Sequence, residues 1–171
     1  MFHAFDKPDA GGGLSRPEWM ALLARAPLAV LEAGLGEHAS VAPHWLRPPE
    51  TGLLMVQGRA GGTGERFNLG EVTVTRCALH LAGDGGCGSG AVGVAYVLGR
   101  EHRRARLAAV ADALLQDPAH RAALQSGLLP AIRQQLAARR AQRAAGTATT
   151  KVEFFTVARE AGAPDQEEGG E

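Results

Sequence analysis

The chain has 171 residues, of which 45% are hydrophobic, and its formal net charge is zero. This length fits one domain with a buried core, and no apolar run reaches the roughly 20 residues that a membrane-spanning helix needs. Residues 1–13 lack the basic start and apolar centre of a secretory signal, so we expect a cytoplasmic protein without a membrane span.

The N-terminal part of the chain predicts two short helices. Residues 1–14 are polar and rich in glycine, which favours a disordered extension. Ser15 can cap the first helix, because Glu18 completes a capping box and Pro17 lies in the first turn. A second helix is predicted over residues 28–35. The apolar stripe of the first helix comprises Trp19, Met20, Leu22 and Leu23.

Between residues 41 and 98 apolar residues recur at every second position, which indicates β-strands. Pro48-Pro49 closes the first strand, and a glycine-rich loop over residues 83–90 precedes the last. Short strands joined by glycine-rich loops predict an antiparallel meander of about four to five strands. The expected strands include residues 43–47, 52–59, 70–81 and 93–98.

After Gly99 the spacing of apolar residues becomes helical. Asp117-Pro118 ends a first long helix and starts a shorter one, and Pro130 can open a third helix in its first turn. Nine arginines lie between residues 100 and 143 against three acids, which is typical of a solvated helical face. The face of the first helix that we expect to be buried comprises Leu107, Val110, Ala111, Leu114 and Leu115.

The end of the chain contains a short apolar segment and an acidic tail. Val152, Phe154, Phe155 and Val157 make up the segment, and residues 160–171 hold five acids and no base. We expect this tail to be disordered. Helices, an antiparallel sheet and further helices follow one another along the chain, so we predict a single α+β domain over residues 15–159.

The most distinctive feature is the turn Gly61-Gly62-Thr63-Gly64 between two predicted strands. Glycines tolerate positive φ, and successive amide N–H groups in such a turn can form a nest for an anion. Flanking arginines can add contacts to phosphate. The alternative is a hairpin connection whose glycines only satisfy turn geometry. The candidate substrate-binding or partner-binding residues are Gln57, Arg59, Gly61, Gly62, Thr63, Gly64, Glu65 and Arg66.

A second glycine pattern matches the dinucleotide-binding fingerprint without its structural context. Gly88, Gly90 and Gly93 have the G-x-G-x-x-G spacing, and Asp112 follows near the usual acidic distance. In that fingerprint the glycines open a helix, whereas these precede a strand. We therefore predict no dinucleotide site.

No catalytic or metal-binding constellation is evident from residue spacing. The six histidines show no H-x-H or H-E-x-x-H pattern, and Cys77 and Cys87 are too few for a disulfide framework, a zinc cluster or an iron–sulfur cluster. Ser126 and Thr51 have no evident activating partner. We predict no catalytic residue and no metal site in this chain.

Residues 50–67, ETGLLMVQGRAGGTGERF, resemble the core signature of the PhnG family, which belongs to the bacterial phosphonate carbon–phosphorus lyase system. The similarity continues through residues 70–76 and 96–100, and into the helix that contains Asp112. It also includes Trp19-Met20 and residues 152–156, so it covers most of residues 18–159. The loop over residues 83–90 and both ends of the chain depart from the family pattern.

The resemblance implies a cytoplasmic subunit of a symmetric hetero-oligomer with PhnH, PhnI, PhnJ and PhnL-like partners. The lack of a strong positive charge and the few aromatic residues predict no nucleic-acid partner. With PhnH, PhnI and PhnL, the family is assigned to making α-D-ribose 1-methylphosphonate 5-triphosphate from ATP and methylphosphonate. MgATP is therefore the implied co-substrate of the complex, and the chain has no implied cofactor of its own. Because displacement of adenine is attributed to PhnI and radical cleavage of the carbon–phosphorus bond to PhnJ, the chain is an implied non-catalytic or co-catalytic subunit, inactive alone.

Three functional hypotheses stay open at the level of the sequence. In the first, the sheet and helices pack against partner subunits. In the second, Arg59, Glu65, Arg66 and neighbouring amides help to hold nucleotide phosphates or to order the site of a partner. The third is a free-standing small-ligand or nucleic-acid binding module that uses the turn over residues 61–64.

Overall fold

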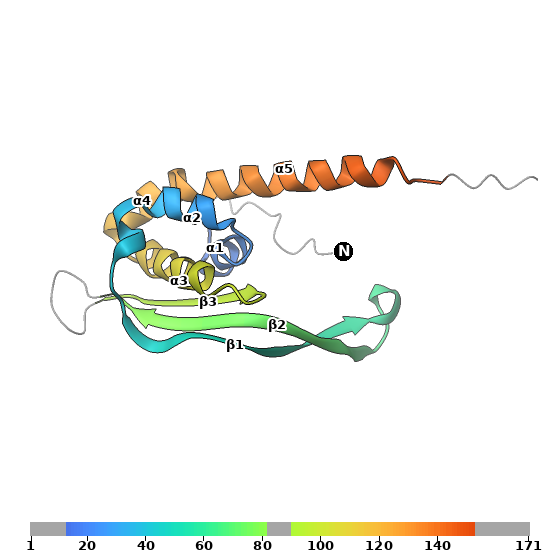
Figure 1. The fold of residues 1–171 in the computed structure, drawn as a ribbon, viewed down its shortest axis with the longest axis horizontal. Coiled ribbons are helices and arrows are strands. Elements are labelled where there is room, and N and C mark those ends of the chain that lie inside the picture. Colours follow the sequence, from blue (N-terminus) through green and yellow to red (C-terminus); the bar gives the residue numbers. More distant parts are fainter. Residues whose placement is uncertain (1–12, 82–89, 153–171) are drawn as a thin grey trace, which may run out of the picture.

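A computed structural model describes residues 13–81 and 90–152 (Figure 1). Residues 1–12 of the predicted disordered extension, the acidic tail, most of the loop over residues 83–90 and the apolar segment after Val152 lie outside the described residues. The described elements are α1 (Arg16–Leu23), α2 (Leu28–Leu35), a short 3₁₀ helix (Gly36–Ser40), β1 (His44–Arg59), β2 (Arg66–His80), β3 (Val92–Leu98), α3 (His102–Gln116), α4 (Pro118–Ser126) and α5 (Leu128–Ala148).

The first helix begins as the sequence predicts. The Ser15 N–H donates to Glu18 Oε2 at 2.8 Å, and the Ser15 hydroxyl donates to the same oxygen at 2.5 Å. These hydrogen bonds favour the ionised carboxylate and lower the pKa of Glu18. Trp19 and Leu23 are buried one turn apart, so the capped helix turns the predicted apolar stripe towards the core.

Within residues 13–81 and 90–152 the sheet is an antiparallel meander of three strands in the order β1-β2-β3, which confirms the antiparallel meander but gives fewer strands than the four to five predicted. The predicted strands over residues 43–47 and 52–59 are one continuous strand, β1. Between Arg47 and Glu50 the register with β2 shifts, and Pro48-Pro49 lies within this irregularity. Proline is tolerated on an edge strand at a bulge because no ladder hydrogen bond is needed there.

β1 and β2 are much longer than β3. β3 pairs with β2 only from Val74 to His80, whereas the pairing of β1 with β2 continues to Arg59 opposite Arg66. Residues 53–73 are therefore a two-stranded ribbon that extends beyond the rest of the domain (Figure 1). We call this ribbon the hairpin arm.

The helices lie on one side of the sheet, and α3 is the central one (Figure 1). α3 is buried continuously from Leu107 to Leu115, and it approaches β3 closely at Gly93, where an added Cβ would overlap the Ala109 carbonyl oxygen. The other face of the sheet is not covered by a described helix. The protein is thus a two-layer α+β domain with its core between the helices and one sheet face.

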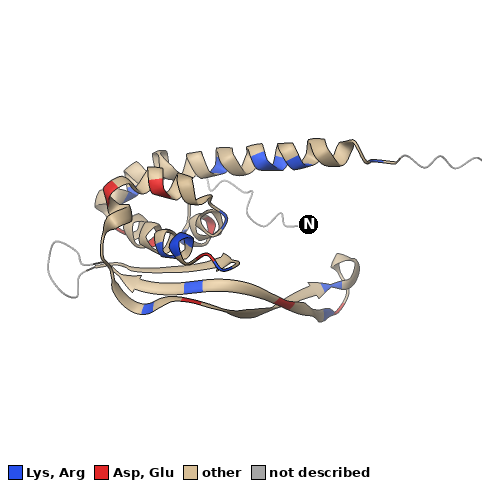
Figure 2. Ribbon diagram, viewed as in Figure 1, with Lys and Arg blue, Asp and Glu red and all other residues tan. Residues whose placement is uncertain are grey.

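The C-terminal helix contributes to the core only through its first turns. Leu128, Leu129 and Ile132 are buried, and Leu136 packs against the core while partly exposed. Residues 137–148 are all exposed. The arginines of this helix face solvent, as predicted, and continue along its projecting part (Figure 2).

Candidate functional site

The eight predicted site residues lie together at the tip of the hairpin arm. Gly61 and Gly62 have φ values of 58° and 84°, a backbone conformation that glycine adopts without steric cost. The Thr63 and Gly64 N–H groups both donate to the Ala60 carbonyl, at 2.9 Å for Gly64. Two of the amides that an anion nest would need are therefore used to close the turn.

Charged side chains bracket the turn (Figure 2). Arg59 is directly opposite Arg66, and its Nη1 donates to the Gly64 carbonyl at 3.1 Å. Below this pair, Gln57 Nε2 donates to Asn68 Oδ1 at 3.1 Å. Like charges directly opposite each other destabilise a β-ladder, so the arginine pair favours contact with an anion or with an acidic surface.

The hairpin arm carries large apolar side chains that the domain does not cover. Leu53 is 65% exposed and Leu69 is 62% exposed, and Leu69 also lies over Gly58, where a Cβ would come within 2.8 Å of it. A two-stranded ribbon is only marginally stable in water, and contiguous exposed apolar patches mark interaction sites. The exposed apolar residues of the hairpin arm are Leu53, Leu54, Met55, Phe67 and Leu69.

The apolar surface continues onto the uncovered face of the sheet. Side chains alternate between the two faces of a strand, and Thr75, Cys77 and Leu79 are buried on the helix side. Leu54, Tyr96 and Leu98 therefore point to the opposite side, where all three are exposed. The tip, the arm and this sheet face together form one extended candidate interface.

A hydroxyl and imidazole cluster joins the base of the arm to α3. The buried Thr75 hydroxyl donates to the Gly99 carbonyl at 2.6 Å and accepts from the Glu101 N–H at 3.0 Å. Thr51 Oγ1 lies 2.9 Å from His102 Nε2, a contact that the sequence analysis did not predict. The two residues are 51 positions apart in the sequence, and no local spacing could have revealed the pair.

This Thr51–His102 pair is not by itself a catalytic arrangement. A catalytic pair of this kind needs a third group that orients the base, and within residues 13–81 and 90–152 no carboxylate is hydrogen-bonded to His102. The cluster links the start of α3 to the two long strands. It therefore fixes the direction in which the hairpin arm leaves the domain.

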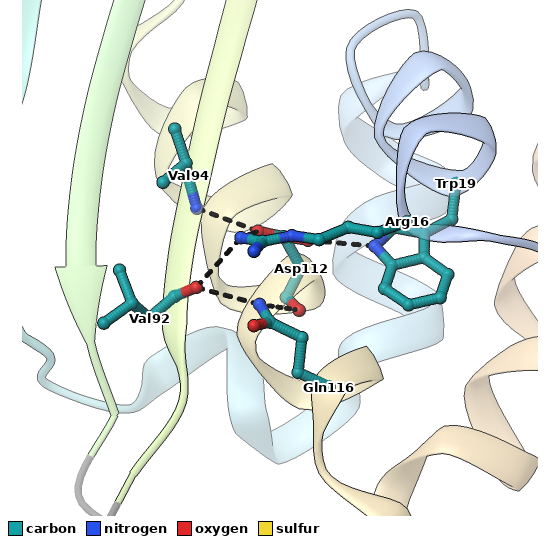
Figure 3. Close-up of polar contacts among 6 residues, drawn as sticks. All are labelled: Arg16, Trp19, Val92, Val94, Asp112 and Gln116. Carbon is teal, nitrogen blue, oxygen red and sulfur yellow. Dashed lines mark hydrogen bonds and ion pairs between the residues drawn. The ribbon is translucent and has the colours of Figure 1, made fainter.

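Asp112 forms the most extensive buried polar network in the described part of the chain (Figure 3). Its carboxylate accepts from Arg16 Nη2 at 2.8 Å, from Trp19 Nε1 at 2.9 Å and from the Val94 N–H at 3.0 Å. The hydrogen bond from Arg16 to Asp112 raises the pKa of the guanidinium, which is protonated in any case. This network joins α1, β3 and α3 through one side chain.

Two residues of the second glycine pattern, Gly93 and Asp112, lie in β3 and α3. Gly93 lies within β3 and does not open a helix, and the Asp112 carboxylate is fully buried and occupied. Gly88 lies outside the described residues. Asp112 is structural, and sequence reasoning missed that role because its partners Arg16 and Trp19 are more than 90 positions away.

Three general features bear on the class of site. Within residues 13–81 and 90–152, no group of three or more histidine, cysteine or acidic residues is placed to hold a metal ion. No helix in the described part of the chain is long and apolar enough to cross a membrane. Burial raises the pKa of the Cys77 thiol to about 11, so this cysteine is protonated and unreactive near neutral pH.

Comparison with known proteins shows which family the chain belongs to. The model of the family described as phosphonate metabolism protein PhnG matches residues 14–160. The chain belongs to the PhnG family. A curated relative from Rhizobium meliloti (strain 1021), named alpha-D-ribose 1-methylphosphonate 5-triphosphate synthase subunit PhnG, is 43% identical over 166 residues, which cover 93% of this chain and 98% of the relative.

Membership of the PhnG family agrees with the resemblance found in the sequence. The signature segment over residues 50–67 forms the distal half of β1, the turn and the start of β2. The signature segment therefore largely coincides with the hairpin arm, none of whose residues belongs to the buried core.

Proposed function

We propose that this PhnG-family chain is a non-catalytic or co-catalytic subunit of an α-D-ribose 1-methylphosphonate 5-triphosphate synthase. In this proposal it acts with PhnH, PhnI and PhnL to transfer the ribose triphosphate of MgATP to methylphosphonate, as part of a carbon–phosphorus lyase complex that also contains PhnJ. The family match and the name of the Rhizobium meliloti relative support the assignment to this synthase.

The observation that carries a subunit role is the hairpin arm. Its apolar side chains are exposed on a ribbon that pairs with nothing beyond its own two strands within the described part of the chain. Burying the exposed part of Phe67 or Leu69 in a partner would contribute on the order of 1 kcal/mol per side chain. The same contact would supply the packing that a free two-stranded ribbon lacks.

The tip of the arm provides the co-catalytic part of the proposal. Arg59 and Arg66 face each other at the end of the ladder, and an anionic group placed between them would relieve their repulsion. We assign them to contact with nucleotide phosphate or with an acidic surface of a partner near its site. The turn amides contribute less, because two of them are bonded to Ala60.

Co-purification with the other subunits tests the role of the arm. When the chain is expressed with its PhnH, PhnI and PhnJ partners, we expect wild type to co-purify stoichiometrically. Phe67→Glu combined with Leu69→Glu should abolish co-purification, because two charges would have to be desolvated in the interface. The control is Val41→Glu, an exposed apolar residue outside the sheet, which should leave co-purification unchanged.

Thermal unfolding of the isolated chains shows whether the arm variants fold. The double variant should keep the wild-type melting temperature, since neither side chain is part of the core. A double variant that folds and still co-purifies would contradict the proposal that the arm is the interface. A wild-type chain that ignores all the partners would contradict the subunit role itself.

Arg66→Ala separates a co-catalytic tip from a purely structural one. We expect product formation by the assembled complex to fall while the subunits still co-purify, because one of two guanidinium groups is lost at the site of negative charge. Arg139→Ala, which removes an exposed arginine from the projecting part of α5, is the matched control and should leave both measurements unchanged. If Arg66→Ala disassembles the complex, the tip serves assembly only.

The alternative of a free-standing binding module predicts a different result. The isolated chain would then bind nucleotide or nucleic acid, with affinity that falls steeply as salt is added in the nucleic-acid case. The Thr63 and Gly64 N–H groups already donate to the Ala60 carbonyl, which disfavours this alternative.

A further inference from the structure

β3 is one edge of the sheet, and the middle of this edge is open. Hydrogen bonds alternate along an antiparallel ladder, so the backbone groups of Val94, Tyr96 and Leu98 point away from β2. Asp112 accepts from the Val94 N–H at 3.0 Å, and Arg104 Nη2 donates to the Leu98 carbonyl at 2.9 Å. No described residue donates to the Tyr96 carbonyl or accepts from its N–H.

An apolar pocket lies next to this open stretch. Its volume is about 230 Å³, and it is formed by α1, β3 and one residue of α3. This volume is below the roughly 300–1,000 Å³ typical of small-molecule sites, so the pocket suits a side chain of a neighbouring strand. The lining residues are Met20, Ala21, Leu23, Ala24, Val94, Ala95, Tyr96 and Ala108.

The β3 edge and the pocket together indicate what kind of segment can bind there. An extended segment would pair with the Tyr96 N–H and C=O and place every second side chain under α1, as in β-strand addition. Arg104 flanks one end of the open stretch, whereas Arg16 at the other end is already paired with Asp112. The occupant is therefore an apolar, strand-forming segment that can bring an acidic residue to Arg104.

The C-terminal segment of this chain has these properties. Residues 152–157 read Val-Glu-Phe-Phe-Thr-Val, a run of β-branched and aromatic residues with one acid and no proline. The acidic residues of the tail, five in the last twelve positions, follow directly.

The geometry of α5 decides which copy of the chain supplies the segment. Leu136 is the last residue of α5 that packs on the core, and the helix continues outward to Ala148 (Figure 1). At 1.5 Å per residue, this projecting part is about 18 Å long. The four residues from Ala148 to Val152 span at most about 14 Å, so they cannot bring the segment back to the β3 edge of its own chain.

We propose that two copies of this chain exchange their C-terminal segments, so that residues 152–157 of each copy form a fourth strand on the β3 edge of the other. The phenylalanine side chain on the helix side of the added strand fills the pocket under α1. The exchange is reciprocal, as the two-fold symmetry of most homodimers requires. It uses a different surface from the hairpin arm, which stays available to other subunits.

Complementation between two full-length variants tests the exchange. Tyr96→Pro removes the N–H at the open edge and spares the ladder with β2, because this N–H points outward. Phe154→Asp combined with Phe155→Asp removes the apolar side chains of the C-terminal segment and leaves the β3 edge intact. In analytical ultracentrifugation we expect a wild-type dimer, and a dimer dissociation constant at least about tenfold higher for each variant alone.

The mixture of the two variants gives the decisive measurement. One copy then has a good segment and the other a good edge, so equal amounts should form a mixed dimer that neither variant forms alone. A control with Ala161→Asp and Ala163→Asp adds the same charge outside the segment and should dimerise like wild type. Circular dichroism melting of each chain establishes that it is folded.

Three results would overturn the proposal. A folded wild-type chain that stays monomeric over the concentration range contradicts exchange between copies, including the case in which a different protein fills the edge. Variants that dimerise as tightly as wild type contradict the assigned edge and segment. A mixture that stays monomeric contradicts reciprocal exchange. Because only this chain is present, none of these results depends on the proposed role in the synthase.

Discussion

At the scale of single residues, Asp112 holds the domain together. Its buried carboxylate accepts hydrogen bonds from donors on α1 and β3, and Gln116 Nε2 donates to the Val92 carbonyl at 2.8 Å beside it (Figure 3). A buried charge is tolerated when it is paired and fully hydrogen-bonded. Removal of the carboxylate leaves the Arg16 guanidinium, the Trp19 indole N–H and the Val94 N–H without their acceptor.

We therefore predict that Asp112→Ala lowers the free energy of unfolding by about 3–5 kcal/mol, the range for breaking a buried ion pair. Urea denaturation followed by circular dichroism measures this change. Glu71→Ala, which removes an exposed carboxylate from the hairpin arm, is the control and should change stability little. A loss for Asp112→Ala similar to that of the control would show that the network contributes no net stability.

Gly93 gives a second prediction at this scale. A methyl group at this position would overlap the Ala109 carbonyl oxygen, which belongs to the backbone of α3 and cannot rotate away. Gly93→Ala should cost about 1–3 kcal/mol or more, as overpacking does. Gly52→Ala is the matched control, because an added Cβ there meets no atom within 4 Å. Equal melting temperatures of the two variants would contradict close packing of α3 on β3.

At the scale of elements, the hairpin arm and the projecting part of α5 are both left uncovered by the rest of the domain. Both leave the body of the domain, and both expose surface along their length. α5 exposes arginines, which water solvates well, whereas the arm exposes leucine, methionine and phenylalanine. The arm is therefore the element whose stability depends most on a partner.

Hydrogen exchange should show this dependence directly. In the isolated chain we expect backbone amides over residues 53–73 to exchange faster than those of Thr75, Cys77 and Leu79, because local opening of a two-stranded ribbon exposes little surface. In the complex the arm should become protected, and residues 137–148 then serve as an internal comparison. If the arm is already as protected in the isolated chain as Cys77 is, it does not need a partner for its order.

At the scale of the whole molecule, a single layer of helices covers a single face of a sheet. This arrangement leaves Leu54, Tyr96 and Leu98 exposed on the other face. A sheet whose uncovered face exposes these apolar side chains is incomplete as an independent unit, which agrees with a protein that functions in an assembly.

Much of this arrangement follows from local sequence signals. The capping box at Ser15, the glycine turn and the helical period after Gly99 all lead to elements that the structure contains. The described part of the chain has fewer strands than predicted because Pro48-Pro49 normally ends a strand, whereas here an edge strand contains both prolines at a register shift. Local signals do not predict such exceptions, because tolerance of a proline pair depends on where the strand lies in the sheet.

The candidate site was only partly accessible to the same reasoning. The position of the turn between two strands could be predicted, and contact of its residues with substrate or partner stays a prediction. The Thr51–His102 pair and the partners of Asp112 could not be predicted, because they join positions far apart in the chain. The length of the arm was also hidden, since it depends on β3 being shorter than its neighbours.

The two edges of the sheet have a consequence for solubility. An open, apolar strand edge invites uncontrolled pairing between chains and eventually aggregation. Here β1 carries a proline pair and an irregular register, and β3 has side chains bonded to its backbone at both ends. A chain that exposes this much leucine and phenylalanine is thereby kept from growing into fibrils, because each edge admits a few residues of a partner strand and no continuous sheet.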